Sequence, residues 1–165
     1  MKPAASPLNI LDFAITNFEF GFNPPDTELD VNIKELFSRY DIDIDFGIHG
    51  NDIIQVFMKA HVNHNEKLPG YTINAEATCI FEFDEQHTIS AEQKSSIGGY
   101  STIYIALNTL RGFISQITAN GPWGRYILPS IDLNDLVEKK KLQLQSNNPK
   151  NEMPKEKKKS SVKRK

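Results

Sequence analysis

The chain has 165 residues, of which 39% are hydrophobic and 24% are charged, which is ordinary for a soluble protein and suits one domain with a modest core. No run of about 18 apolar residues occurs, so a transmembrane helix is not expected. The N-terminus has one lysine and no continuous apolar stretch, so we expect no secretory signal. Cys79 is the single cysteine, which agrees with a reducing compartment, and we expect a cytoplasmic protein.

The net charge of −2 conceals an acidic body and a basic C-terminal end. From Lys150 onward, eight Lys and Arg side chains oppose Glu152 and Glu156, so this end carries +6 and residues 1–149 carry −8. Residues 145–165 have almost no apolar content and are expected to form a disordered basic tail. We expect residues 1–9 to be flexible and residues 10–144 to form the folded domain.

Alternating apolar residues predict four strands in the first half of the chain. Leu11, Phe13 and Ile15 alternate with polar or small residues, and the apolar parity then shifts at Phe18, which predicts a strand with a bulge. Three further segments alternate without a slip and are joined by short turns: residues 42–48, 54–62 and 71–83. Between the first two strands, residues 29–37 are ambiguous, and we favour a short helix.

The two parities of these strands differ in chemistry. The apolar side chains, which lie on one face of the sheet, must be buried against another element, whereas the polar side chains on the other face can remain in water. The acidic residues on this other face are Asp41, Asp43, Asp45, Glu76, Glu82 and Asp84. Residues 86–96 are polar and are expected to form a surface crossover from the sheet to a helix.

A long helix is predicted after the Gly98–Gly99 pair, with Ser101 or Thr102 as its N-cap. Asn120, Gly121 and Pro122 should end it, through a left-handed residue and a proline that cannot continue the helix. Its apolar stripe contains Ile103, Ala106, Leu107, Leu110, Phe113, Ile114 and Ile117.

A neighbouring face of this helix carries Ile105, Asn108 and Gly112. Glycine destabilises a helix unless another element approaches closely, so we predict a seam between subunits at this face. A shorter helix should begin at Asp132. The sequence therefore predicts an α+β fold, in which a four-stranded antiparallel meander sheet packs against a long helix and a shorter C-terminal helix.

The C-terminal half of the chain resembles the SecB family of export chaperones. The shared sequence features are the glycine pair and tyrosine at Gly98–Tyr100, the long helix, the break at Gly121–Trp123 and the segment Leu128–Leu133. The resemblance extends over residues 9–144. It implies a SecB-like fold and a homotetramer, in which the helices lie between two sheets.

The resemblance also implies a function. SecB-like proteins are ATP-independent holdases that bind unfolded preproteins for export and need no cofactor. By position, Tyr100, Trp123, Tyr126 and Ile127 would line a client groove. For the aromatic residues Trp123 and Tyr126, however, core packing between helix and sheet is the default interpretation.

The resemblance further implies a partner, the SecA-type translocation ATPase, which would contact Glu76, Glu82 and Asp84. The alternative is that these acidic residues only keep the sheet surface in water.

A dedicated chaperone of one client, such as an antitoxin, is an alternative function on the same fold. The tail is more basic than SecB-like tails usually are. Binding of nucleic acid through it is a further alternative, which we do not favour.

Catalysis and metal binding are not expected. The sequence has no G-x-S-x-G elbow, Walker loop or H-E-x-x-H motif, so we predict that the protein is not an enzyme. His61 and His64 are three residues apart, which places two strand residues on opposite faces and argues against a shared metal. Cys79 lies on the apolar parity and is expected to be a buried hydrophobic residue rather than a nucleophile.

Overall fold

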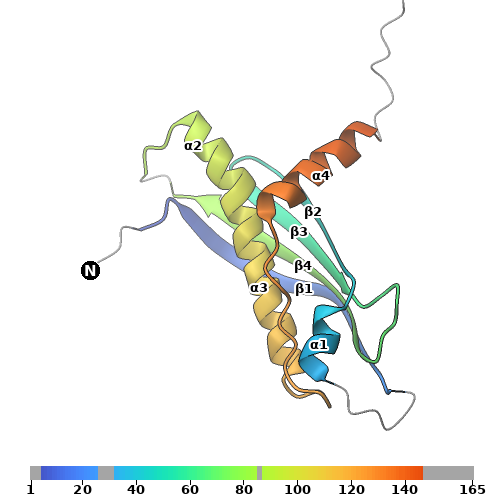
Figure 1. Cartoon of the computed structure of the whole chain (residues 1–165). Helices are drawn as coiled ribbons and strands as arrows, with labels where there is room; N and C mark the ends of the chain where they lie inside the picture. Colours follow the sequence, from blue (N-terminus) through green and yellow to red (C-terminus); the bar gives the residue numbers. More distant parts are fainter. Residues whose placement is uncertain (1–4, 26–31, 85–86, 147–165) are drawn as a thin grey trace, which may run out of the picture. The chain divides into compact units, whose positions relative to one another are not determined.

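The computed structural model describes residues 5–25, 32–84 and 87–146 (Figure 1). Its strands are β1 (Leu8–Asn23), β2 (Ile42–His49), β3 (Ile53–Val62) and β4 (Gly70–Phe83). Its helices are α1 (Ile33–Ser38), α2 (Ala91–Ser96), the π-helical turn η1 (Ile97–Ser101), α3 (Thr102–Thr118) and α4 (Leu133–Ser146). The chain up to Leu133 forms one compact unit and the chain from Asn134 a second, and each is described by itself.

The sheet has four antiparallel strands in the order β1-β4-β3-β2. Short hairpins join β2, β3 and β4, as the turn signals predict. β1, however, lies beside β4 and not beside β2, so the arrangement is a Greek key rather than a simple four-strand meander. The connection that contains α1 is long enough to bring the chain across the sheet. The predicted α+β class, with one long and one shorter C-terminal helix, is confirmed.

β1 contains the predicted bulge and also a second one. Leu11 and Thr16 are each an extra residue between successive pairs with β4. The shift at Thr16 moves the following phenylalanines onto the apolar face, and the ring of Phe18 meets the ring of Phe113 in α3 edge-on, 5.1 Å between centroids. β1 begins at Leu8, which is buried, so the strand includes the last two residues of the segment 1–9 that we predicted to be flexible.

α3 covers the apolar face of β3 and β4, and the core lies between them (Figure 1). The predicted apolar stripe of the helix is confirmed along most of its length, since Leu110 and Ile114 are fully buried. The exception is Ile117, which is 36% exposed near the end of the helix. The sheet contributes the buried side chains of Val56, Met58, Ala60, Val62, Ile73, Ala75, Cys79 and Phe81.

The long helix begins earlier than predicted. Ser90 is the N-cap of α2, where its hydroxyl accepts a hydrogen bond from the Gln93 amide and the Gln93 side chain accepts one from the Ser90 amide. The turn η1 then continues α2 into α3, and Figure 1 shows an uninterrupted helix. The Gly98–Gly99 pair therefore lies inside the helix, and the predicted crossover over residues 86–96 is partly helical. Gly98 permits close packing, because a Cβ there would lie 3.0 Å from Cδ1 of Ile54.

α3 ends at Thr118, where the predicted break occurs, but not through the predicted left-handed residue. The amides of Ala119, Asn120 and Gly121 bond back to carbonyls of the last turn, and the positive φ, 72°, is found later at Gly124. Residues 124–132, which we call the return segment, then run back along α3 (Figure 1).

α4 begins directly after Asp132, as predicted, and ends at Ser146, slightly beyond the predicted domain boundary. An ion pair joins the Asp135 carboxylate and the Lys139 ammonium across one helical turn, with 2.8 Å between Oδ2 and Nζ. Most of the predicted basic tail, from residue 147, lies outside the described residues, as do residues 1–4. Among the helices that the structure describes, none is long and apolar enough to span a membrane.

Candidate functional site

Aromatic rings gather where β1 ends and β4 begins. We call this group the aromatic cluster. Each ring has a neighbour with its centroid between 5.3 and 6.0 Å away, often edge-on, as aromatic pairs prefer. Its members come from β1, α1, the link between α1 and β2, β4 and the chain after α3: Phe22, Phe37, Tyr40, Tyr71, Trp123 and Tyr126.

Tyr71 holds the turn after α3 in place. Its hydroxyl donates a hydrogen bond to the carbonyl of Gly124 and accepts one from the amide of Trp123, both at 2.9 Å. Burial raises the pKa of Tyr71, which keeps the hydroxyl protonated and able to donate. Gly121 permits this contact, because a Cβ at that position would lie 2.5 Å from the Tyr71 hydroxyl.

The four residues predicted to bind clients lie in different environments. Tyr126 is 1% exposed and packs against the rings of Phe37 and Tyr40, which corresponds to the core-packing alternative. Trp123 is half-buried, with its ring edge-on to a β1 phenylalanine. Tyr100 and Ile127, in contrast, are 41% and 61% exposed, so their side chains offer apolar surface.

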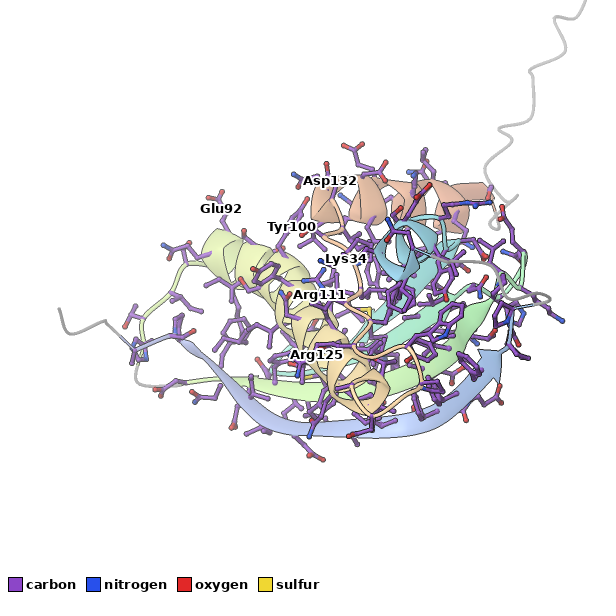
Figure 2. All side chains as sticks on the ribbon, turned by 60° about the horizontal axis from the view of Figure 1, so that its bottom comes forward. Lys34, Glu92, Tyr100, Arg111, Arg125 and Asp132 are labelled. Atoms are coloured by element: carbon purple, nitrogen blue, oxygen red, sulfur yellow. The ribbon has the colours of Figure 1, made fainter. Side chains whose placement is uncertain are left out.

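The return segment is fastened to α3 by Arg111, which sequence reasoning missed. The guanidinium donates hydrogen bonds to the carbonyls of Leu128 and Pro129, each at 2.9 Å, and also contacts Asn108 (Figure 2). Leu128 is buried while Ile127 points outward, so this clamp fixes which side chains the segment exposes. The available signal was an arginine beside an apolar stripe, followed by a proline-containing segment whose carbonyls need donors.

The predicted subunit seam lies on an open face of α3. Gly112 is exposed, and a Cβ there would have no described atom within 4 Å. Ile105 and Asn108 are partly buried, and the Asn108 side chain donates to the carbonyl of Tyr104. Packing among the described residues of one chain therefore does not explain the glycine, and the seam stays a prediction.

The face of the sheet away from α3 is acidic, as the parity predicts. We call it the acidic face. The strand register places these carboxylates on it: Asp12, Glu19, Asp43, Asp45, Glu76 and Glu82. Lys59 lies between Asp45 and Glu76 on the neighbouring strands, and its Nζ is 2.7 Å from Oε1 of Glu76. Glu76, a predicted partner-binding residue, is thus already paired with a cation.

Two cavities lie at the opposite end of the sheet from the aromatic cluster, and they share Phe83 and Lys94. The Lys94 ammonium is 2.7 Å from Asp52 and lies over the Phe83 ring, 5.2 Å from its centroid. The first cavity, of about 320 Å³, is lined by Asp52, Ile53, Glu82, Phe83, Asp84, His87, Thr88, Ile89 and Lys94. The second, of about 360 Å³, includes Ile48, Ile54, Gly98 and Gly99 in its lining.

Two of the predicted partner-binding residues, Glu82 and Asp84, therefore border a cavity at the end of the sheet. Asp84 also holds the His87 imidazole, with 3.2 Å between Oδ2 and Nδ1. The third, Glu76, lies further along β4 on the acidic face. The structure thus brings Glu82 and Asp84 together at one end of the acidic face.

The prediction for the two histidines is wrong, whereas the prediction for the cysteine is confirmed. The rings of His61 and His64 stack at 5.2 Å, so their predicted separation onto opposite faces is wrong. β3 ends at Val62, and the positive φ of Asn63, 54°, turns His64 back toward His61. No three His, Cys, Asp or Glu side chains in residues 5–25, 32–84 and 87–146 are placed to hold a metal ion. Cys79 is buried, as predicted, and burial raises its pKa to about 11.

A solved structure with a similar arrangement is the Mycobacterium tuberculosis Rv1957 SecB-like chaperone, in complex with a ChAD peptide from the Rv1956 HigA1 antitoxin. The two superpose with a TM-score of 0.51 over 76% of this chain and 91% of that chain, at 10% sequence identity. The fold is SecB-like. The fold that the sequence resemblance implied is thereby confirmed.

A second solved structure, a protein of unknown function from Streptococcus agalactiae, aligns with a TM-score of 0.42 and 6% identity, over 78% of this chain and 100% of that chain. Neither a known protein family nor a curated protein matches the sequence.

Proposed function

We propose that the protein is an ATP-independent holdase chaperone that binds unfolded polypeptides. The SecB-like fold is the observation that carries this proposal, because the similar Rv1957 is a SecB-like chaperone bound to a peptide. Exposed apolar side chains on the long helix and the return segment support it. They are Tyr100, Tyr104 and Ile127, with exposed fractions of 41%, 60% and 61%.

The proposed mechanism is burial of apolar surface. An unfolded client exposes apolar side chains, and each 100 Å² removed from water contributes about 2.5 kcal/mol. Such contacts are non-directional, so a surface built from them accepts many sequences. Binding and release then depend on the client and not on a nucleotide.

The test is suppression of aggregation by a reduced, unfolded test protein in the absence of nucleotide. Ile127→Asp places a charge on the proposed client surface, and we expect it to weaken suppression severalfold without lowering the melting temperature. Phe57→Asp is the matched control, because Phe57 is 47% exposed but lies on the acidic face. Equal loss in both variants, or no suppression by the wild type, would refute the proposal.

A dedicated chaperone of one client is the second candidate function. The peptide bound to Rv1957 comes from an antitoxin, and this observation supports the narrow function as well as the broad one. A panel of unrelated unfolded proteins separates the two, since a general holdase should protect most of them and a dedicated chaperone very few. As a general export holdase, the protein would also bind the translocation ATPase through Glu76, Glu82 and Asp84.

We further propose self-association through the seam of Ile105, Asn108 and Gly112, with a homotetramer as the expected assembly. Gly112→Leu should weaken this association, because a leucine would hold the two helices apart. Sedimentation of the wild type and the variant at several concentrations measures the effect. Gln143→Leu adds the same side chain to an exposed position of α4, outside the seam, and is the control. An unchanged assembly in Gly112→Leu would contradict the seam.

A further inference from the structure

α1 lies over part of the aromatic cluster. The ring of Phe37 is 5.3 Å from that of Tyr126, 5.6 Å from Tyr71 and 5.4 Å from Tyr40, measured between centroids. The preceding residue, Leu36, is 8% exposed. Phe37 from a short helix thus packs on rings that belong to β4 and the return segment, and the buried Leu36 precedes it.

The attachment of α1 is local. It has six residues, well below the length at which an isolated helix is stable. Within the part of the chain that the structure describes, the hydrogen bonds of residues 32–39 all stay within residues 32–40. α1 also has no extensive backbone contact with another described element. Its side chains, chiefly Leu36 and Phe37, therefore hold it in place.

The residue after this segment is anchored much more firmly. The Tyr40 hydroxyl donates to the carbonyl of Pro69 and accepts from the amide of Tyr71, both at 2.9 Å. Tyr40 is 5% exposed and lies two residues before the start of β2. α1 can therefore move without disturbing the sheet, because Tyr40 holds the chain where β2 begins.

The covered cluster contains a polar group with no partner. The hydroxyl of Tyr126 makes no hydrogen bond to any described residue, although the side chain is 1% exposed. Burial raises the pKa of this phenol, so it stays protonated. An unsatisfied buried hydroxyl destabilises the covered state relative to one in which water or a peptide carbonyl reaches it.

We propose that α1 is a displaceable lid, and that an apolar side chain of an unfolded polypeptide takes the place of Phe37 on the other rings of the aromatic cluster. This inference rests on the proposed holdase function. The chain's own Phe37 shows that the rings accept an aromatic side chain, and the Tyr126 hydroxyl is available to a carbonyl of the incoming backbone. Client binding and lid opening are then one equilibrium.

Such an equilibrium makes the apparent affinity depend on the open fraction. The Asn32 side chain caps α1 by accepting a hydrogen bond from the Glu35 amide, and it is exposed. Asn32→Ala removes the cap and should favour the open lid, so the dissociation constant for client should fall about two- to fivefold. Lys34→Gln is the control, because it changes an exposed residue of α1 at nearly equal helix propensity and should leave affinity unchanged.

The deciding experiment combines this titration with hydrogen exchange. A reduced, carboxymethylated protein that cannot refold is the client probe for wild type, Asn32→Ala and Lys34→Gln. At saturating probe, the amides of α1 should exchange at least tenfold faster, whereas those of β3 and β4 keep their protection.

The outcomes separate the lid from the holdase function. Client binding with α1 equally or better protected, or with no gain from Asn32→Ala, would overturn the lid and leave the holdase function standing. No binding by any of the three proteins would refute the holdase function, and the lid with it.

Discussion

Replacing Asn63 with alanine should destabilise the folded unit by about 3–5 kcal/mol, because the side chain makes three hydrogen bonds from a fully buried position. Its Nδ2 donates to the carbonyls of Leu68 and Tyr71 at 2.8 and 2.9 Å, and its Oδ1 accepts from the Leu68 amide at 2.7 Å. Alanine would leave these backbone groups buried without partners. It would also hold a φ of 54°, which asparagine tolerates better.

Thermal unfolding measures this effect, and the melting temperature should fall by about 10–20 °C. Asn65→Ala is the control, since Asn65 lies two residues further along, is exposed, and donates its side-chain hydrogen bond to Asp41. We expect that change to lie within about 1 kcal/mol of the wild type. Similar losses in the two variants would contradict the assigned role of Asn63.

Gly70→Ala should have an effect of similar size, about 3–5 kcal/mol, from strain and overpacking together. Gly70 has a φ of 104°, and a Cβ there would lie 1.9 Å from the Tyr40 hydroxyl and 2.9 Å from two ring carbons of Trp123. The variant can keep its sheet only by pushing both rings aside. The aromatic cluster should therefore loosen together with the loss of stability.

Denaturant unfolding followed through Trp123 fluorescence reports both changes, because Trp123 is the single tryptophan of the chain. The emission of folded Gly70→Ala should shift to longer wavelength as the ring becomes more exposed. Gly99→Ala is the control, since a Cβ there would meet no described atom within 4 Å and alanine favours the helix. A native-like spectrum and midpoint in Gly70→Ala would show that the close approach is not required.

The layering of the sheet and the long helix could be predicted from sequence because it depends on local periodicity. A period of two decides which face a side chain such as Glu76 or Met58 occupies, and helical spacing places Leu110 in the core. Strand neighbours do not follow from such patterns. The pairing of β1 with β4 depends on contacts between segments that are distant in sequence.

The helix start was mispredicted because two local signals compete. The Gly98–Gly99 pair suggests a boundary, but the capping box of Ser90 and Gln93 begins the helix earlier, and a π turn carries it past the glycines.

The aromatic site was predictable in position but not in detail. Trp123 and Tyr126 could be nominated from their place after the long helix. Which of them is buried depends on the ring of Phe37, from a helix too short to give a clear pattern. The roles of Arg111 and Asn63 could not be predicted for a related reason. Each side chain hydrogen-bonds to backbone groups of a segment whose path cannot be derived from the sequence.

The two bulges of β1 also bear on the risk of aggregation at the edge of the sheet. β1 is the longest strand and lies at a border of the sheet, where its outer amides and carbonyls are open to pairing. A regular edge strand of this length could pair with strands of other chains and so nucleate fibril formation. Leu11 and Thr16 interrupt the regular hydrogen-bond pattern of β1. A strand from another chain would therefore need bulges at the matching positions to pair with the whole length of β1.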